Sequence, residues 1–205
     1  QIAALAASLC IGVAVIAVAQ GPSDGPPGPE RLGTVAKTSE QQEQSLSILR
    51  RARVATDRLP PELVARLSET PFGANGALSR RAFSRGEESV FVIPANERVC
   101  LAMDEAKGAT ITCPPDRAVA DGSSVGTTSF ASQVAVYGLV PDGVDAVSVR
   151  LATGEQVTSE TAGNAYLVHV QGEPRSLAFE GPSGRVEAPI AAVDGPIRAA
   201  PQPLP

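Results

Sequence analysis

Residues 133–160 read QVAVYGLVPDGVDAVSVRLATGEQVTSE, and this stretch decides the fold class. Two apolar runs, 133–139 and 144–151, flank the tetrapeptide Val140-Pro141-Asp142-Gly143. Proline at the second position and glycine at the fourth are typical of a β-turn, so Pro141, Asp142 and Gly143 are expected to form a structural turn. In the second run, Val147 and Val149 alternate with Ser148 and Arg150, which is the two-residue period of a strand.

Strand-like runs continue at intervals of about ten residues towards the C-terminus. They cover 156–160, 165–170, 175–180 and 185–188, and turns rich in glycine, asparagine, proline and serine separate them. Short strands at this spacing indicate an all-β domain. The expected fold class is mainly β, a small antiparallel β-sandwich or open barrel of meander hairpins. A transmembrane or signal helix and a short helical neck are expected to precede it.

Two cysteines lie in a predicted hairpin formed by residues 98–103 and 109–113. The centre of its loop lies between Ala106 and Lys107, so facing residues should have numbers that add up to 213. Cys100 then faces Cys113, and facing Cα atoms of an antiparallel ladder lie about 4.5–5.5 Å apart, within reach of a disulfide. We expect a Cys100–Cys113 bridge if the domain is exported; two unpaired buried thiols are the alternative for a reducing compartment.

The N-terminal segment, which begins at Ile2 and ends at Ala19, has 18 residues without a charge or a proline. As a helix it would span about 27 Å, close to the thickness of the bilayer core. The run favours a membrane anchor, but Ala17-Val18-Ala19 also resembles a signal-peptidase site, and both alternatives stay open. Either one exports the domain on its C-terminal side, so the expected location is the outer side of a cell membrane, or secretion if Ala19 is a cleavage site.

The rest of the chain divides by composition. Residues 1–20 form the apolar segment, 21–39 a tether rich in proline and glycine, and 40–70 a helical neck. The neck should hold a helix over 40–58 that begins after an N-cap at Ser39, and a second short helix with Leu59, Leu63 and Leu67 on one face. We expect this leucine face to pack on the β domain of residues 88–190. Residues 191–205 are expected to be a disordered tail.

The net charge of −5 argues against nucleic acid as a partner. From Cys100 onward, twelve carboxylates stand against six cations, and such a surface repels polyanions. The stretch between Arg50 and Arg85 is richer in arginine, but acidic residues are interleaved with it. A solvated surface of mixed charge is the favoured interpretation of this stretch, and a binding patch is the alternative.

Residues 137–149, together with 58–63 and the Cys100 to Cys113 segment, carry a resemblance to a known group. They resemble uncharacterised membrane-anchored proteins of high-GC actinobacteria. The resemblance implies a membrane-anchored protein of the bacterial cell envelope, and it implies no activity.

Few residues are candidates for chemistry. His169 is the only histidine, and no S-x-x-K motif is present. A zinc site needs three or four ligands, usually cysteine and histidine, but one of the three cysteines, Cys10, lies in the apolar segment. Calcium could use Asp116 and Asp121 beside Asp104-Glu105, but no calcium-loop motif occurs, so solvated carboxylates are favoured. We therefore expect no catalytic, cofactor-binding or metal residues and no cofactor.

These features lead to one main hypothesis and two rivals. The main hypothesis is a non-catalytic extracytoplasmic binding domain, tethered to the membrane through the Ile2 to Ala19 segment, whose candidate partner is another envelope protein. The first rival is the outer half of a bitopic envelope-stress regulator, similar to an anti-sigma factor. The second is a hydrolase built from Ser123, Ser124, Asp121 or Asp116. The oligomeric state and the ligand are left open.

Overall fold

The computed structural model describes residues 37–105, 108–130 and 133–191. Strands make up 48% of the described residues, which confirms a mainly β fold. The helices are α1 (Glu40–Ser45), α2 (Ser47–Arg50), α3 (Pro61–Ser68) and α4 (Asp116–Ala120), with the 3-10 turns η1 (Ala55–Asp57) and η2 (Gly76–Leu78). The strands are β1 (Arg80–Arg85), β2 (Glu88–Ala95), β3 (Arg98–Glu105), β4 (Gly108–Thr112), β5 (Val125–Phe130), β6 (Gln133–Leu139), β7 (Ala146–Leu151), β8 (Gln156–Glu160), β9 (Ala165–Val170), β10 (Pro174–Gly181) and β11 (Gly184–Pro189).

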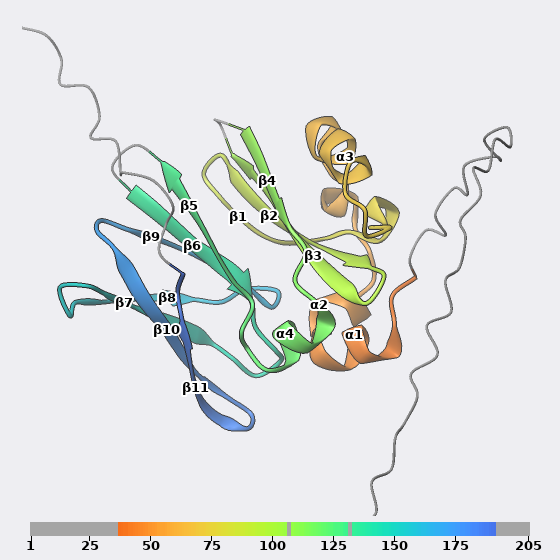
Figure 1. Ribbon diagram of the computed structural model, residues 1–205. Helices are drawn as coiled ribbons and strands as arrows, with labels where there is room; N and C mark the ends of the chain where they lie inside the picture. Colours follow the sequence, from red (N-terminus) through yellow and green to blue (C-terminus); the bar gives the residue numbers. More distant parts are fainter. Residues whose placement is uncertain (1–36, 106–107, 131–132, 192–205) are drawn as a thin grey trace, which may run out of the picture. The chain divides into compact units, whose positions relative to one another are not determined.

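The described strands form three antiparallel sheets and no closed barrel (Figure 1). Sheet A has the strand order β1-β2-β3-β4, sheet B the order β5-β6-β9, and sheet C the order β11-β10-β7-β8. Sheets A and C each have four strands and sheet B has three. The expected sandwich of two sheets is therefore extended by a third sheet.

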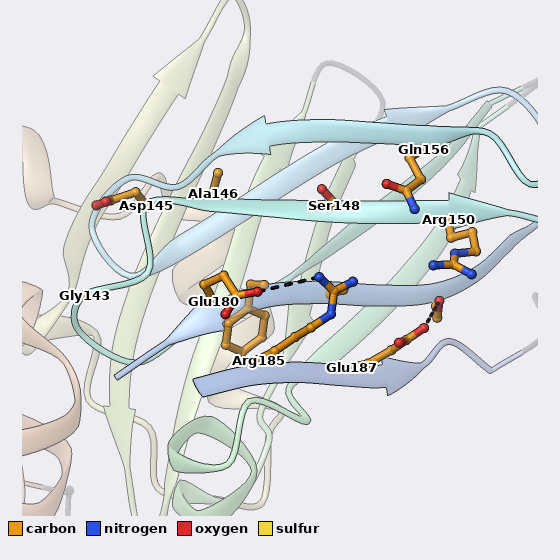
Figure 2. Close-up of a pocket in the computed structure, with 12 residues that line it drawn as sticks. Gly143, Asp145, Ala146, Ser148, Arg150, Gln156, Glu180, Arg185 and Glu187 are labelled. Carbon is orange, nitrogen blue, oxygen red and sulfur yellow. Dashed lines mark hydrogen bonds and ion pairs between the residues drawn. The ribbon is translucent and has the colours of Figure 1, made fainter. Parts of the chain in front are cut away.

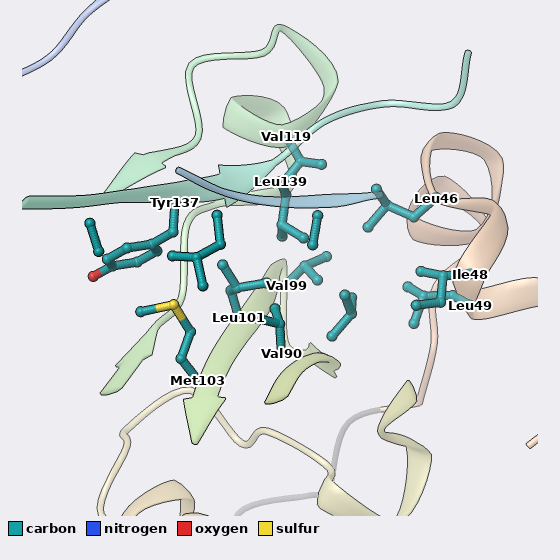
Figure 3. Packing of buried hydrophobic residues seen from close by; sticks show 14 residues of the cluster. Leu46, Ile48, Leu49, Val90, Val99, Leu101, Met103, Val119, Tyr137 and Leu139 are labelled. Atoms are coloured by element: carbon teal, nitrogen blue, oxygen red, sulfur yellow. The ribbon is translucent and has the colours of Figure 1, made fainter. Parts of the chain in front are cut away.

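Three clusters of buried apolar side chains show how α3 and the three sheets are stacked on one another. Leucines of α3 pack with one face of sheet A. The other face of sheet A packs on sheet B through residues such as Leu101 and Leu139 (Figure 3). The second face of sheet B packs on sheet C through residues such as Tyr166 and Val149. The layers are thus α3, sheet A, sheet B and sheet C, and no described element covers the outer face of sheet C.

The β3–β4 hairpin has the expected register. Leu101 faces Thr112 and Ala102 faces Ile111, so the numbers of facing residues add up to 213. Cys100 and Cys113 form the disulfide, with their Cα atoms 3.9 Å apart. Alternation along β3 sends Cys100 into the cluster below α3 and Leu101 into the cluster between sheets A and B. The bridge therefore lies on the α3 side of sheet A.

The expected meander of hairpins is wrong for the second half of the chain. Strand β6 pairs with β5 and β9, whereas β7 pairs with β8 and β10. The turn at residues 141–143 therefore joins two sheets instead of two paired strands. The physical reason lies in β6, where Val134 and Val136 face sheet C and Ala135 and Tyr137 face sheet A. A strand that is apolar on both faces is stabilised in the middle layer, not at an outer surface.

The single helix expected over 40–58 is also wrong. Ser39 caps α1 as expected, with its side chain accepting a hydrogen bond from the Gln42 N–H, but the helix ends at Ser45 and the next residue, Leu46, is extended with a φ of −131°. The break lets the fully buried Leu46 enter the cluster between sheets A and B, as do Ile48 and Leu49 of α2 (Figure 3). Burial of these side chains outweighs the continued backbone hydrogen bonding of one helix.

The sequence patterns did not predict two of the strands and one of the helices. Strand β1 begins at Arg80, before the expected start of the β domain at 88, and β5 lies between the predicted hairpin and the apolar run that begins at 133. Both are edge strands of their sheets and carry arginine, serine, threonine or glycine, so they lack the apolar alternation that predicts a strand. Helix α4 has only five residues, too few for a helical period to show.

The apolar segment 2–19 lies outside the described residues, as do positions 21–36 of the expected tether and 192–205 of the expected tail. Across residues 37–191, apart from the two short gaps, no helix has the length and apolar character to cross a membrane. The anchor or signal segment stays a prediction.

Candidate interaction surface

The outer face of sheet C is the sheet face that the described layers leave uncovered. Along β7, Val147, Val149 and Leu151 point inward to the core, so Ala146, Ser148 and Arg150 point outward. On β10 the same alternation turns Leu177 and Phe179 inward. The outward side chains of these two central strands are mostly small.

Small side chains at the centre and longer ones at the rim produce a groove of about 430 Å³ (Figure 2). Ala146 and Ser148 of β7 lie beside Ser176 and Ala178 of β10, since Ser148 faces Ala178 in the β7–β10 ladder. The neighbouring strands supply the longer rim side chains, which are Gln156 from β8 and Arg185 and Glu187 from β11.

Part of the charge in the groove is already paired. Arg185 lies 3.6 Å from Glu180, and Glu187 accepts a hydrogen bond of 3.0 Å from the Ser176 hydroxyl. The side chains of Arg150 and Asp145, in contrast, have no hydrogen-bond or ion-pair partner among the described residues. Five residues of extended chain separate them, which corresponds to about 16 Å along β7. The groove therefore has a free cation at one end and a free carboxylate at the other (Figure 2).

The turn between β6 and β7 shapes the carboxylate end. Gly143 lines the groove with a φ of +83°, a left-handed conformation that favours glycine. Its neighbour Asp142 accepts hydrogen bonds from the Ser47 N–H at 2.6 Å and from the Asn164 side chain at 2.8 Å, and pairs with Arg50 at 2.7 Å. Burial by itself would raise the pKa of Asp142, but these donors outweigh burial and lower it.

Asn164 completes this junction from the turn between β8 and β9. It has a φ of +62°, and its side-chain oxygen accepts a hydrogen bond of 3.0 Å from the Ile48 N–H. Leu46, the residue before α2, offers no side-chain cap, so Asp142 and Asn164 satisfy the first N–H groups of that helix from a distance in sequence. The sequence marked both residues only as members of turns.

His169 lies on β9 and meets a carboxylate of sheet A, not a nucleophile. Its Nε2 lies 3.1 Å from Glu88 Oε1 at the start of β2. Glu105 at the end of β3 has one carboxylate oxygen buried without a hydrogen-bond partner among the described residues. Burial and the nearby Glu88 raise the pKa of Glu105, and His169 opposes this shift. Glu88, Glu105 and His169 thus lie close together where sheets A and B meet.

The residues proposed for a hydrolase are not assembled with a base. Ser123 donates to Asp121 Oδ1 at 2.6 Å, and the buried Ser124 hydroxyl accepts a bond of 3.4 Å from the Leu139 N–H. Asp116 accepts a hydrogen bond from the Gln42 side chain at 3.0 Å. His169 forms its hydrogen bond with Glu88 and with none of these residues.

The carboxylates considered for calcium do not assemble either. No group of three or more histidine, cysteine, aspartate or glutamate side chains suited to a metal ion occurs in the described part of the chain. Asp116 is tied to Gln42, and Asp121 to Ser123.

Comparisons with known proteins do not indicate a function, so the function is inferred from the geometry of the structure. No protein-family model, no curated protein and no solved structure matches the chain.

Proposed function

We propose that the chain is a non-catalytic binding domain that recognises an extended segment of another protein in the groove on sheet C. The observation that carries this proposal is the uncovered groove with unpaired charges at its two ends, Arg150 and Asp145. Every other sheet face in the described residues is packed against another layer, except at its rim. A concave surface with convergent polar groups is the usual form of a recognition site.

The distance between the free charges limits the occupant. About 16 Å corresponds to roughly five residues of extended chain, so an acidic side chain near Arg150 and a basic one near Asp145 would lie about five residues apart. The small floor formed by Ala146, Ser148, Ser176 and Ala178 leaves space for a backbone to lie close to the sheet. We propose that this segment belongs to another envelope protein, with the domain on the outer side of the membrane.

Photocrosslinking tests the site in the full-length chain. A photoreactive amino acid in place of Ala178, on the floor of the groove, should give one dominant crosslinked protein in cells. The same amino acid in place of Glu155, which is exposed in the β7–β8 turn outside the groove, is the matched control. Arg150→Glu should abolish the Ala178 crosslink and leave the melting temperature unchanged. Equal crosslinking from both positions, or no effect of Arg150→Glu, would contradict the proposal.

A further inference from the structure

A second surface lies between α2 and α3, on the segment around η1. Two adjoining hollows of about 360 and 520 Å³ occupy it. Arg53 and Arg58 line both hollows, so these two side chains lie where the hollows adjoin. Leu59 and Leu67 form part of the wall of the smaller hollow.

This surface also holds exposed apolar side chains. Val54 and Val64 are each 52% exposed, and no other large hydrophobic residue in the described part of the chain is exposed. Val54 lines the larger hollow and Val64 the smaller one. One exposed valine is ordinary on a protein surface, but both lie on the same small area. We call Arg53, Val54, Arg58 and Val64 the arginine-valine surface.

The two arginines are free to bind a ligand. Neither Arg53 nor Arg58 has a side-chain hydrogen bond or ion pair with another described residue. The carboxylate nearest in sequence, Asp57, is 0% exposed and already accepts two bonds from Arg51, at 2.6 and 2.8 Å. Asp57 also accepts backbone N–H groups from Val54 and Arg81, each at 2.7 Å. The surface is therefore cationic although the chain carries a net charge of −5.

We infer that the arginine-valine surface binds a polypeptide segment that combines acidic and aliphatic side chains. Carboxylates of the segment pair with Arg53 and Arg58, whose planar guanidinium groups match that geometry. An aliphatic side chain of the segment, between two of its carboxylates, enters the smaller hollow, which Val64, Leu59 and Leu67 line. This surface is distinct from the groove on sheet C, and the inference does not depend on that groove.

An anionic membrane fits the same surface less well. Binding to acidic lipid headgroups commonly uses clusters of about four to eight cations, and this surface has two free arginines. Tryptophan and tyrosine, which favour the membrane interface, do not line either hollow. A hollowed surface also receives a chain segment more readily than a flat bilayer.

The inference is tested with the full-length chain and synthetic peptides. The probe is a fluorescent peptide of alternating glutamate and leucine, and peptides of lysine with leucine and of glutamate with serine are its controls. The variant Arg53→Glu with Arg58→Glu should weaken binding of the glutamate-leucine peptide by about tenfold or more, because attraction becomes repulsion at both sites. The matched control, Arg66→Glu with Arg117→Glu, changes the net charge equally at two exposed arginines that line neither hollow. It should change the affinity by less than about twofold.

Three outcomes would overturn the inference. Equal weakening by both double variants would show an unspecific charge effect. Equal affinity for the glutamate-serine peptide, or no effect of Val64→Ser, would show that aliphatic side chains do not contribute to binding at this surface. Binding to phosphatidylglycerol vesicles that needs Arg53 and Arg58, with no peptide binding, would assign the surface to lipid. All the substituted side chains are exposed, so unchanged melting temperatures are expected and separate loss of binding from loss of folding.

Discussion

Asp57 shows how a single buried side chain organises the segment before the first sheet. Its two oxygens bind Arg51 and the N–H groups of Val54 and Arg81, while the Ser79 hydroxyl donates to its backbone carbonyl at 2.6 Å. Donors from four residues thus converge on Asp57. Burial by itself would raise the pKa of Asp57, but the bonds from Arg51, Val54 and Arg81 outweigh burial and hold the pKa well below its usual range.

Asp57→Asn is expected to destabilise the fold by about 2–4 kcal/mol at pH 7, because it leaves Arg51 and a buried N–H without an acceptor. The stability from the depressed pKa is full above the unfolded pKa of about 3.9 and is lost as the pH falls towards the folded value. The variant should therefore lose less stability than the native chain between pH 5 and about pH 2. Urea denaturation at several pH values measures both effects. Asp145→Asn, at an exposed carboxylate without a partner, should change stability by less than about 0.5 kcal/mol.

Glu105 should show the opposite pH dependence. Its folded pKa lies above its unfolded value because burial and Glu88 disfavour the charged form. The resulting stability is full below the unfolded pKa of about 4.3 and disappears as the pH rises through the folded pKa. Glu105→Gln removes this charge, so it should raise stability at pH 7 by up to about 1 kcal/mol and have less effect at pH 4. A loss of stability at pH 7 in thermal melts would argue against a disfavoured charge at this position.

At the scale of elements, sheet A depends on contacts on both of its faces. The disulfide and the leucines of α3 lie on one side, and the cluster with sheet B on the other. Cys100 and Cys113 join β3 to the residue after β4, across a sequence separation of 13. The bridge therefore restrains the edge strand β4, which has β3 as its only neighbour in the sheet.

Reduction of this bridge should lower the free energy of unfolding by about 2–3 kcal/mol, because the open chain regains the entropy of a short loop. The melting temperature of the reduced protein measures the effect, and Cys100→Ala with Cys113→Ala should reproduce it. Non-reducing mass spectrometry should show one peptide linked through these two cysteines. A bridge from either of them to Cys10 would contradict the hairpin register.

At the scale of the whole molecule, one junction joins the N-terminal helices to two sheets. Asp142 and Asn164 lie in turns that cross between sheets B and C, and both bind the first N–H groups of α2. The Asp142 N–H also donates to the Ser45 carbonyl at 3.0 Å. Residues more than 90 positions apart thus meet where the layers end.

Asp142→Ala should loosen the N-terminal helices without unfolding the sheets. The substitution removes acceptors for the Ser47 N–H and for Arg50, and a cost of about 1–3 kcal/mol is expected. Hydrogen exchange should accelerate in residues 40–50 and stay unchanged in β3 and β6. Uniform acceleration across all strands would show that the junction stabilises the whole fold and not this segment.

Local patterns explain which features were predictable. The sequence by itself determined the mainly β class and the hairpin register that places Cys100 opposite Cys113, because alternation and loop length act over a few residues. It also indicated that Leu59, Leu63 and Leu67 share a face, and they do pack on sheet A.

Only the tertiary structure decided which sheet each strand joins, which sheet face stays uncovered, and which charges are free. Strand β7 comes after β6 in sequence but lies in another sheet, because burial of both faces of β6 governs the layering. Likewise, the arginines around Asp57 look alike in sequence, yet Arg51 is bound to that carboxylate while Arg53 and Arg58 face solvent. Such differences arise from contacts between residues far apart in the chain, whose energies no local pattern records.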